Sequence, residues 1–184
     1  ESEVWRYERV LTGTDDYLVM DSLGNNRWWG GVVGDWRLGS IGETPLRLHP
    51  GANGVDAVVT FVAPWTGQIR IGAAGEIRTY ESEGDGVRLR IMRNDEIIWP
   101  AEGWHQVDPG VRWVFPEFEL DIEAGDRLRF VVNAGSAGNN NWDETYWEPR
   151  ITYDYVAVQS VVLSEERLEL AVGETAVLAA TVYP

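Results

Sequence analysis

The alternation of hydrophobic and polar residues predicts short β-strands through most of residues 61–153. Four runs each place apolar side chains on one face and charged side chains on the other: residues 69–71, 87–91, 118–122 and 128–132. A period of two is typical of a half-buried strand. Turn sequences such as Gly84-Asp85-Gly86 and Ala124-Gly125-Asp126 separate the runs at near-regular intervals. The pattern favours an all-β fold, an antiparallel β-sandwich or barrel, and it predicts no long helix.

The first third of the chain is predicted to be less regular. Residues 4–11 alternate loosely, which predicts a first strand, and an acidic turn follows at residues 13–16. Residues 21–54 form the longest predicted irregular stretch and are rich in Gly and Asn. Loops of this length are uncommon unless they are functional or mobile. We therefore expect this stretch to carry part of a functional site.

Motifs in residues 61–153 follow one another in a recognisable order. They read F-x-A-P-x-T-G from Phe61, G-D-G-V from Gly84, I-x-W-P-x-x-G-W from Ile97, A-G-D from Ala124, V-N, N-N, and D-x-T-x-W-x-P-x-I-T-Y from Asp143. In order and spacing they resemble a jelly-roll module that is appended to secreted bacterial polysaccharide-degrading enzymes and belongs with the carbohydrate-binding modules. The resemblance covers about half of the chain, and it extends more weakly into the first third through Trp28, Gly30 and His49-Pro50.

The resemblance implies that residues 1–155 form a β-sandwich of the jelly-roll type. It implies a non-catalytic module that binds a neutral or acidic polysaccharide and tethers a secreted bacterial glycoside hydrolase or polysaccharide lyase to it. Modules of this type often carry a structural calcium ion.

Two alternatives stay open: an adhesion or spacer module of a cell-surface protein, and a glycosidase or lyase domain. The sequence gives the enzyme alternative little support. Its two histidines, His49 and His105, have no serine elbow or metal-ligand spacing near them. No spacing singles out the pair of carboxylates that glycoside hydrolysis needs.

Composition narrows the range of partners and compartments. The formal net charge of -15 argues against nucleic acid, because affinity for phosphates comes largely from Lys and Arg. The chain has no cysteine, which excludes disulfides and thiolate metal sites. No apolar run approaches the ~18 residues of a membrane span. The resemblance implies a secreted protein. No basic-then-apolar leader precedes Glu1, so any signal peptide has been removed or lies outside this sequence.

Ten tryptophans in 184 residues are a large excess and suggest an aromatic binding platform. An indole face packs against the flat C–H patch of a sugar ring, and loops on a rigid β scaffold concentrate binding residues. We expect the platform among seven tryptophans: Trp28, Trp29, Trp36, Trp65, Trp104, Trp113 and Trp142. We also expect ligand contacts from Asn140, Arg88 and Arg90.

Some tryptophans have a structural interpretation instead. Trp99, Trp104 and Trp147 belong to the motif pattern, which favours a framework role for all three, and Trp99 and Trp147 are expected in the core. Trp28 could plug one end of the sandwich. The turn Pro64-Trp65-Thr66-Gly67 predicts that Trp65 is exposed.

All 15 basic side chains other than histidine are arginines. Alternation places Arg70, Arg88, Arg90 and Arg129 on the outward faces of their strands, where neighbouring strands could align them into a basic stripe. One interpretation is a solvated face balanced by acidic residues such as Glu119. The other is a site for a polysaccharide bearing uronate or pyruvate groups, because guanidinium groups pair well with carboxylates.

Calcium is the ion that the loop residues favour. Asp85, Asp126, Asn139 and Asp143 are hard oxygen ligands in loops, the type that Ca²⁺ prefers. The D-x-D-x-D-G pattern of a calcium loop is absent. The alternative is therefore that these residues cap strands and turns.

The last segment, residues 156–184, has a different pattern and resembles the opening of a bacterial immunoglobulin-like domain of the second group. Such a sandwich needs about 100 residues. The 29 residues of this segment would supply only its first two or three strands. We therefore expect neighbouring domains in a larger chain, and a truncated segment that docks, pairs between molecules or frays.

Overall fold

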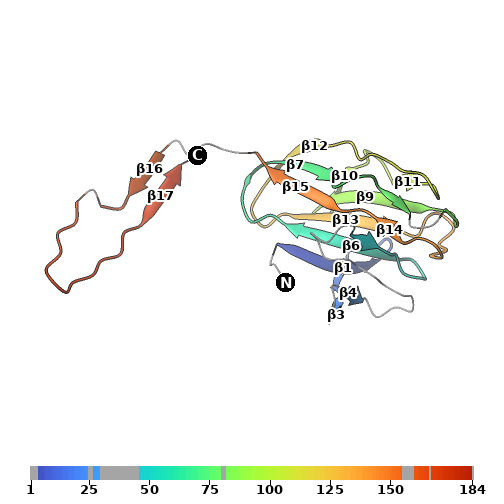
Figure 1. The fold of residues 1–184 in the computed structure, drawn as a ribbon, viewed down its shortest axis with the longest axis horizontal. Helices are drawn as coiled ribbons and strands as arrows, with labels where there is room; N and C mark the ends of the chain where they lie inside the picture. Colours follow the sequence, from blue (N-terminus) through green and yellow to red (C-terminus); the bar gives the residue numbers. More distant parts are fainter. Residues whose placement is uncertain are drawn as a thin grey trace. The chain divides into compact units, whose positions relative to one another are not determined.

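The computed structural model describes residues 4–24, 27–29, 46–79, 82–154, 160–165 and 167–183. These residues form strands and no helix, and all the strand pairings among them are antiparallel. Within the same ranges, no helix is long and apolar enough to cross a membrane. The chain divides into two compact units, Glu1–Tyr153 and Asp154–Pro184, and the expected domain boundary at residue 155 lies close to this division (Figure 1).

The larger sheet of the first unit follows the order β10-β9-β13-β6-β1-β2, and β11 also pairs with β9. Its strands are β1 (Trp5–Leu11), β2 (Leu18–Val19), β6 (Val55–Val62), β9 (Val87–Arg93), β10 (Glu96–Trp99), β11 (His105–Val107) and β13 (Arg127–Asn133). β9 and β13 contain the strands expected at residues 87–91 and 128–132. They pair with Phe130 opposite Ile91, so their apolar side chains face the same side.

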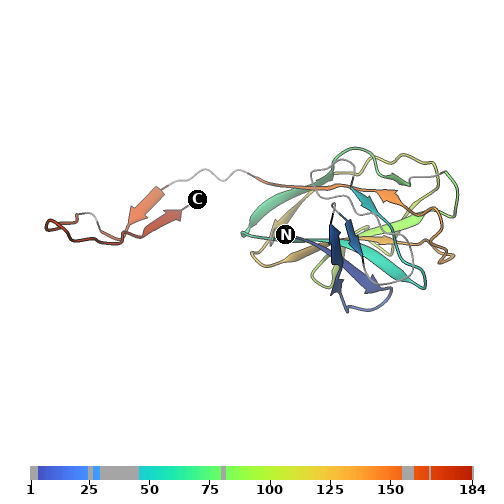
Figure 2. The same ribbon diagram turned by 60° about the horizontal axis from the view of Figure 1, so that its bottom comes forward.

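Two shorter sheets complete the unit. One contains β12 (Phe118–Ile122), β7 (Gly67–Ala73) and β15 (Pro149–Tyr153) in that order, and the other contains β5 (Arg47–Leu48), β14 (Thr145–Tyr146) and β8 (Arg78–Thr79). One buried cluster joins Phe130 of the larger sheet to Ile69 and Ile71 of β7. Two layers around one hydrophobic core confirm the expected β-sandwich (Figures 1 and 2).

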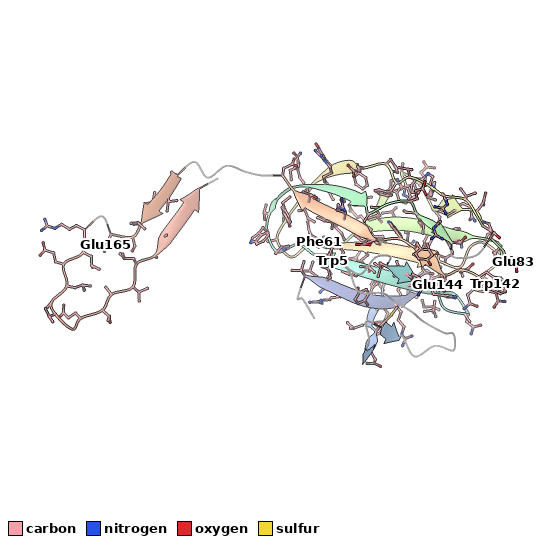
Figure 3. All side chains as sticks on the ribbon, in the orientation of Figure 1. Trp5, Phe61, Glu83, Trp142, Glu144 and Glu165 are labelled. Atoms are coloured by element: carbon pink, nitrogen blue, oxygen red, sulfur yellow. The ribbon has the colours of Figure 1, made fainter. Side chains whose placement is uncertain are left out.

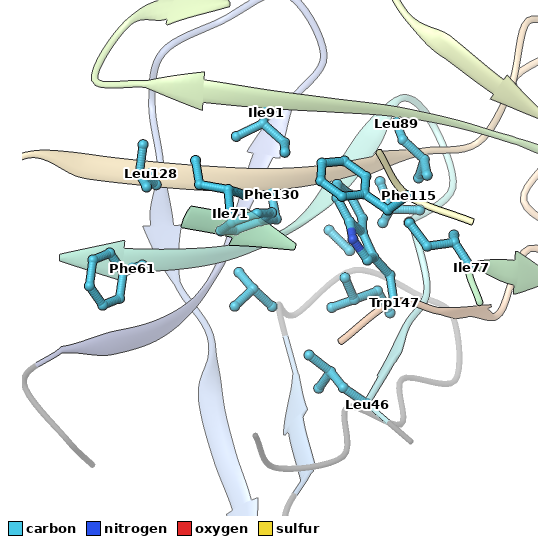
Figure 4. Close-up of a cluster of buried hydrophobic side chains, with 14 of the residues drawn as sticks. Leu46, Phe61, Ile71, Ile77, Leu89, Ile91, Phe115, Leu128, Phe130 and Trp147 are labelled. Carbon is cyan, nitrogen blue, oxygen red and sulfur yellow. The ribbon is translucent and has the colours of Figure 1, made fainter. Parts of the chain in front are cut away.

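Trp147 lies inside this core, as expected for a framework residue. Its side chain is 1% exposed, and its ring meets Phe130 edge-on with 5.5 Å between the ring centroids. Phe115 packs 6.4 Å from the same ring, and Leu46 is fully buried (Figure 4). Trp99 is partly buried and packs against the same cluster. These large rings fix how the two layers sit and thereby position the loops between them.

The expectation of an irregular stretch at residues 21–54 was partly wrong. β3 (Asp21–Gly24) and β4 (Arg27–Trp29) pair antiparallel, with Ser22 opposite Trp28, and β5 also falls within this stretch. The physical reason is that aromatic residues have high strand propensity. Two adjacent tryptophans therefore extend the backbone in spite of the surrounding Gly and Asn.

The second unit contains one two-stranded ladder. β16 (Ser160–Leu163) pairs with β17 (Ala180–Tyr183), with Leu163 opposite Ala180. Every side chain described in residues 160–165 and 167–181 is exposed. A lone two-stranded ladder is marginally stable in water. The described part of this unit therefore has no hydrophobic core of its own.

Replacing Trp147 by alanine should lower the free energy of unfolding by about 3–5 kcal/mol, because it leaves a large cavity in the core. Trp65→Ala is the matched control. Trp65 is 67% exposed, so its loss should cost less than about 1 kcal/mol. Urea denaturation followed by far-UV circular dichroism measures both variants. Equal losses would contradict the placement of Trp147 at the centre of the core.

Candidate functional site

The outer side of the larger sheet carries the first candidate surface. Alternation along β9 and β13 turns Arg88, Arg90 and Arg129 away from the core, and the register sets Arg90 opposite Val131. We call the surface formed by Tyr17, Arg88, Arg90, Trp104 and Arg129 the arginine–aromatic face.

An apolar floor lies beneath the arginine–aromatic face. Val10, Val58, Met92 and Val131 are buried in a cluster separate from the main core, and Tyr17 and Trp104 pack against it. Because the cluster lies on the outer side of the sheet, it would meet water without these two rings. The two aromatic rings therefore anchor the face by the burial of apolar area.

The guanidinium groups of the face stack on its aromatic rings. The guanidinium carbon of Arg90 lies 4.1 Å from the centroid of the Trp104 ring, and that of Arg88 lies 5.4 Å from it. The Arg129 guanidinium carbon lies 3.8 Å from the Tyr17 ring centroid. Arrangements of this kind are cation–π interactions, which hold the side chains in fixed positions.

A buried polar network supports one edge of the face. Arg88 donates from Nε and Nη2 to Asn133 Oδ1 at 3.0 and 2.8 Å. Asn133 Nδ2 donates in turn to Asp56 Oδ1 at 2.6 Å, and Thr12 Oγ1 donates to the same oxygen at 2.6 Å. Burial raises the pKa of Asp56 above its ordinary value, and the hydrogen bonds from Thr12 and Asn133 oppose that shift. The network joins β9, β13, β6 and the segment after β1.

The expected stripe of four arginines was wrong in one member. Arg70 lies on β7 in the other layer, where its Nη2 lies 3.1 Å from Glu119 Oε1. Alternation shows which way a side chain points from its strand, but it does not show to which sheet the strand belongs. Arg88, Arg90 and Arg129 share one sheet, and Glu119 balances Arg70 alone.

The second candidate site is a pair of carboxylates, Asp85 and Asp143, which we call the acidic pair. Asp143 is fully buried, and neither of its carboxylate oxygens has a hydrogen-bond partner. Burial and the charge of Asp85 raise the pKa of Asp143 to about 8. Asp85 Oδ2 accepts a hydrogen bond from the Ala137 amide at 3.3 Å, whereas its buried Oδ1 has none.

The backbone around the acidic pair is tightly fitted. A Cβ atom on Gly84 would lie 3.0 Å from the Asn141 carbonyl oxygen and 3.9 Å from Asp143 Oδ1. Trp142 adopts a φ of 71°, a conformation that costs a bulky residue energy, and its side chain is 51% exposed. Figure 3 shows Trp142 at the same end of the unit as Glu83. The loop thus exposes an indole directly beside the buried carboxylate.

The acidic pair fits a hard cation better than the other expected ligands do. Three buried carboxylate oxygens without partners, two of Asp143 and one of Asp85, are the donor type that Ca²⁺ takes. No group of three His, Cys, Asp or Glu side chains suited to a metal occurs in the described part of the chain. Backbone carbonyls, such as that of Asn141, and water would have to complete such a site.

Asp126 and Asn139 have other roles in the structure. Asp126 Oδ2 lies 2.6 Å from Arg93 Nη2, and its Oδ1 accepts a hydrogen bond from Asn94 Nδ2 at 2.8 Å. These hydrogen bonds lower the pKa of Asp126 against the effect of burial. Asp126 contacts Arg93 at the end of β9, whereas Asp85 lies just before the start of β9, so the two carboxylates lie at opposite ends of this strand. Asn139 Oδ1 accepts from the Asn141 amide at 3.1 Å, which is a local turn contact.

The remaining expected ligand residues are spread over the unit. Trp65 is exposed, as expected, and its ring meets Tyr153 edge-on at 5.7 Å. Trp113 is only partly exposed, because its ring lies 5.5 Å from Trp99 and 4.0 Å from His105. Asn140 Nδ2 donates to the Pro50 carbonyl at 3.4 Å.

Three expected tryptophans belong to the first third of the chain. Trp28 and Trp29 are described only as backbone positions of β4, and Trp36 lies outside the described residues. The residues that define the arginine–aromatic face all come from other described parts of the chain.

Thr12, Tyr17 and Asp56 are residues of the face and its network that sequence reasoning missed. Tyr17 directly follows the acidic turn predicted at residues 13–16, and its hydroxyl donates to Met92 Sδ at 3.4 Å across 75 residues of sequence. Asp56 did leave a signal. It is a charged residue in the otherwise apolar run of β6, and such a residue needs buried partners.

In the absence of divalent cations, Asp143 should make the wild type less stable as pH rises. Its pKa is raised in the folded state from 3.8 to about 8, so its contribution to folding is fully present below pH ~4 and is lost as pH approaches 8. Asp143→Asn does not titrate. Urea denaturation in chelator at pH 5 and pH 8 should therefore show the variant gaining stability relative to wild type, and a constant difference would contradict the raised pKa.

No protein-family model matches the chain, and no curated protein matches it. The arginine–aromatic face, the acidic pair and the exposed tryptophans are the features of the described residues that bear on function.

Proposed function

We propose that the first unit is a non-catalytic polysaccharide-binding module of a secreted bacterial protein. The observation that supports this most is the arginine–aromatic face. Two aromatic rings, three guanidinium groups and a network of amide, hydroxyl and carboxylate groups stand on one rigid sheet face. A sugar ring offers complementary chemistry, because its C–H patches pack on aromatic rings and its hydroxyls hydrogen-bond to polar side chains.

The shape of a sheet face suits a polymer. Neighbouring strands lie ~4.8 Å apart, so the four strands β9, β13, β6 and β1 span ~15 Å. That width accommodates more than one sugar ring. The loop end, where Trp142 is exposed beside the acidic pair, offers a second place for a polymer to make contact.

The role that follows is tethering. A module that holds a polymer keeps any linked catalytic domain at a high effective concentration of substrate. Binding through contacts of modest strength is sufficient for this role, because the linkage makes the second encounter intramolecular.

We propose that the acidic pair binds Ca²⁺ and that the ion stabilises the loop end of the module. Two carboxylates held together in a buried site repel each other, and a bound cation removes the repulsion and replaces the missing hydrogen bonds. The role of the ion would be structural, because it would order the segment that carries Trp142.

Trp104→Ala should weaken binding of the module to its polysaccharide by about fivefold, because stacking on an aromatic ring contributes about 1 kcal/mol. Affinity electrophoresis across glucan, xylan, mannan and uronate polymers measures this, with near-UV circular dichroism as the test of folding. Arg150→Ala, an exposed change on β15, is the control and should bind as wild type does. Absence of retardation of the wild type by every polymer would overturn the proposed function and favour the adhesion or spacer role.

Calcium should raise the melting temperature of the wild type at pH 8 and leave that of Asp143→Asn unchanged. A ligand present at about 100 times its dissociation constant stabilises by about 2.7 kcal/mol, which calorimetry resolves easily. Asp121→Asn, an exposed change on β12, serves as the control and should respond as wild type does. Equal shifts in Asp143→Asn and wild type would rule out a calcium site at the acidic pair.

A further inference from the structure

Arg90 differs from the other two arginines of the arginine–aromatic face in what surrounds its charge, because Arg88 hydrogen-bonds to Asn133 and Arg129 pairs with Asp95. Arg90 makes no hydrogen bond or ion pair with any described residue, and its buried Nε has no partner. The guanidinium of Arg90 instead stacks on the Trp104 ring, a cation–π contact. The guanidinium is thus held in place by a ring but its N–H groups are not used by the described residues.

Five arginines described in the unit have carboxylate partners. The ion pairs are Arg47–Glu144, Arg70–Glu119, Arg93–Asp126, Arg112–Glu76 and Arg129–Asp95. With 30 acidic residues in the chain, partners are plentiful. Arg88 and Arg90 nevertheless have no carboxylate partner within the described residues, and Arg88 hydrogen-bonds to an amide oxygen of Asn133 instead.

The charges near Arg90 do not neutralise it directly. Asp56 attracts the charge of Arg90 through space, but its Oδ1 accepts from Thr12 and Asn133 and it forms no ion pair with Arg90. Asp95 pairs with Arg129, at 3.6 Å. Arg90 therefore has no ion-pair partner among the described residues of a protein with a net charge of -15.

The chemistry of this arrangement selects a carboxylate. A guanidinium fixed in plane by stacking presents a rigid fork of N–H donors, and a carboxylate matches that fork with two oxygens. The nearby Trp104 ring can pack on the sugar that bears the carboxylate. Local attraction at this distance outweighs the distant negative charges of the chain, which salt screens beyond about 10 Å.

We propose that Arg90 recognises the carboxylate of a uronic acid residue, so that the arginine–aromatic face binds an acidic polysaccharide in preference to a neutral one. This inference rests on the proposed function and names the class of sugar that the same face takes. Arg88 and Arg129 line the subsite on either side and add positive potential.

The experiment compares two sets of oligosaccharides that differ in whether their carboxylates carry a charge. Isothermal titration calorimetry of the whole chain uses short galacturonate oligomers and the same oligomers with their carboxylates methyl-esterified. The free acids should bind at least tenfold more tightly than the esters, and only their binding should weaken when NaCl rises from 0.05 to 0.5 M. Equal affinities would overturn the carboxylate assignment while leaving the module a polysaccharide binder.

Variants then assign the effect to one side chain. Arg90→Ala should lose at least tenfold in affinity for the free acid and none for the ester. Arg90→Lys keeps the charge without the planar fork and should recover only part of the loss. Arg150→Ala, exposed on the other layer, should bind as wild type does. An unchanged affinity in Arg90→Ala, with near-UV circular dichroism matching wild type, would refute the role of Arg90.

A third set of outcomes separates this inference from the proposed function. Binding of xylan, glucan or mannan without binding of any uronate would support the module and refute the carboxylate subsite. Tight binding of sulfated polymers with no response to galacturonate would also refute it. Failure to bind any polymer, charged or neutral, would overturn both proposals together.

Discussion

Burial of both faces of the central strands is the constraint on which the first unit depends. Six of the eight residues of β6 are buried, on the core side and on the outer side alike. A strand in a sandwich normally buries one face and leaves the other to water. Here the outer face needs its own cover, and the side chains that supply it are the rings of Tyr17 and Trp104 and the arginines stacked on them. The layer that completes the fold is therefore also the layer for which we propose a ligand.

The two candidate sites use burial in opposite ways. On the arginine–aromatic face, apolar burial holds the aromatic rings in place, and the buried Nε of Arg90 has no hydrogen-bond partner. At the acidic pair, burial acts directly on charge, because the carboxylate of Asp143 has lost water and gained no hydrogen bond. The first arrangement suits the large ligand that we propose. The second leaves carboxylate oxygens without hydrogen bonds, which is the reason for proposing a small cation there.

The second unit contrasts with the first because its described side chains are all exposed. Its antiparallel ladder matches the expectation of strands in this segment. A ladder without a covered face depends on additional strands for stability. This agrees with the expectation, from resemblance, that the segment is the opening of an immunoglobulin-like domain, which stays a prediction.

The sequence by itself determined the all-β class, most of the long strands and the exposure of Trp65. Alternation of side chains and the residues of turns are local signals, so runs such as residues 128–132 could be read directly. Only the tertiary structure decided which strands share a sheet. It separated Arg70 from Arg90, set Asp85 beside Asp143, and brought Tyr17 onto Met92 across 75 residues of sequence. Strand pairing decided these placements, because alternation gives the side of a strand on which a residue lies and not the strand that lies next to it.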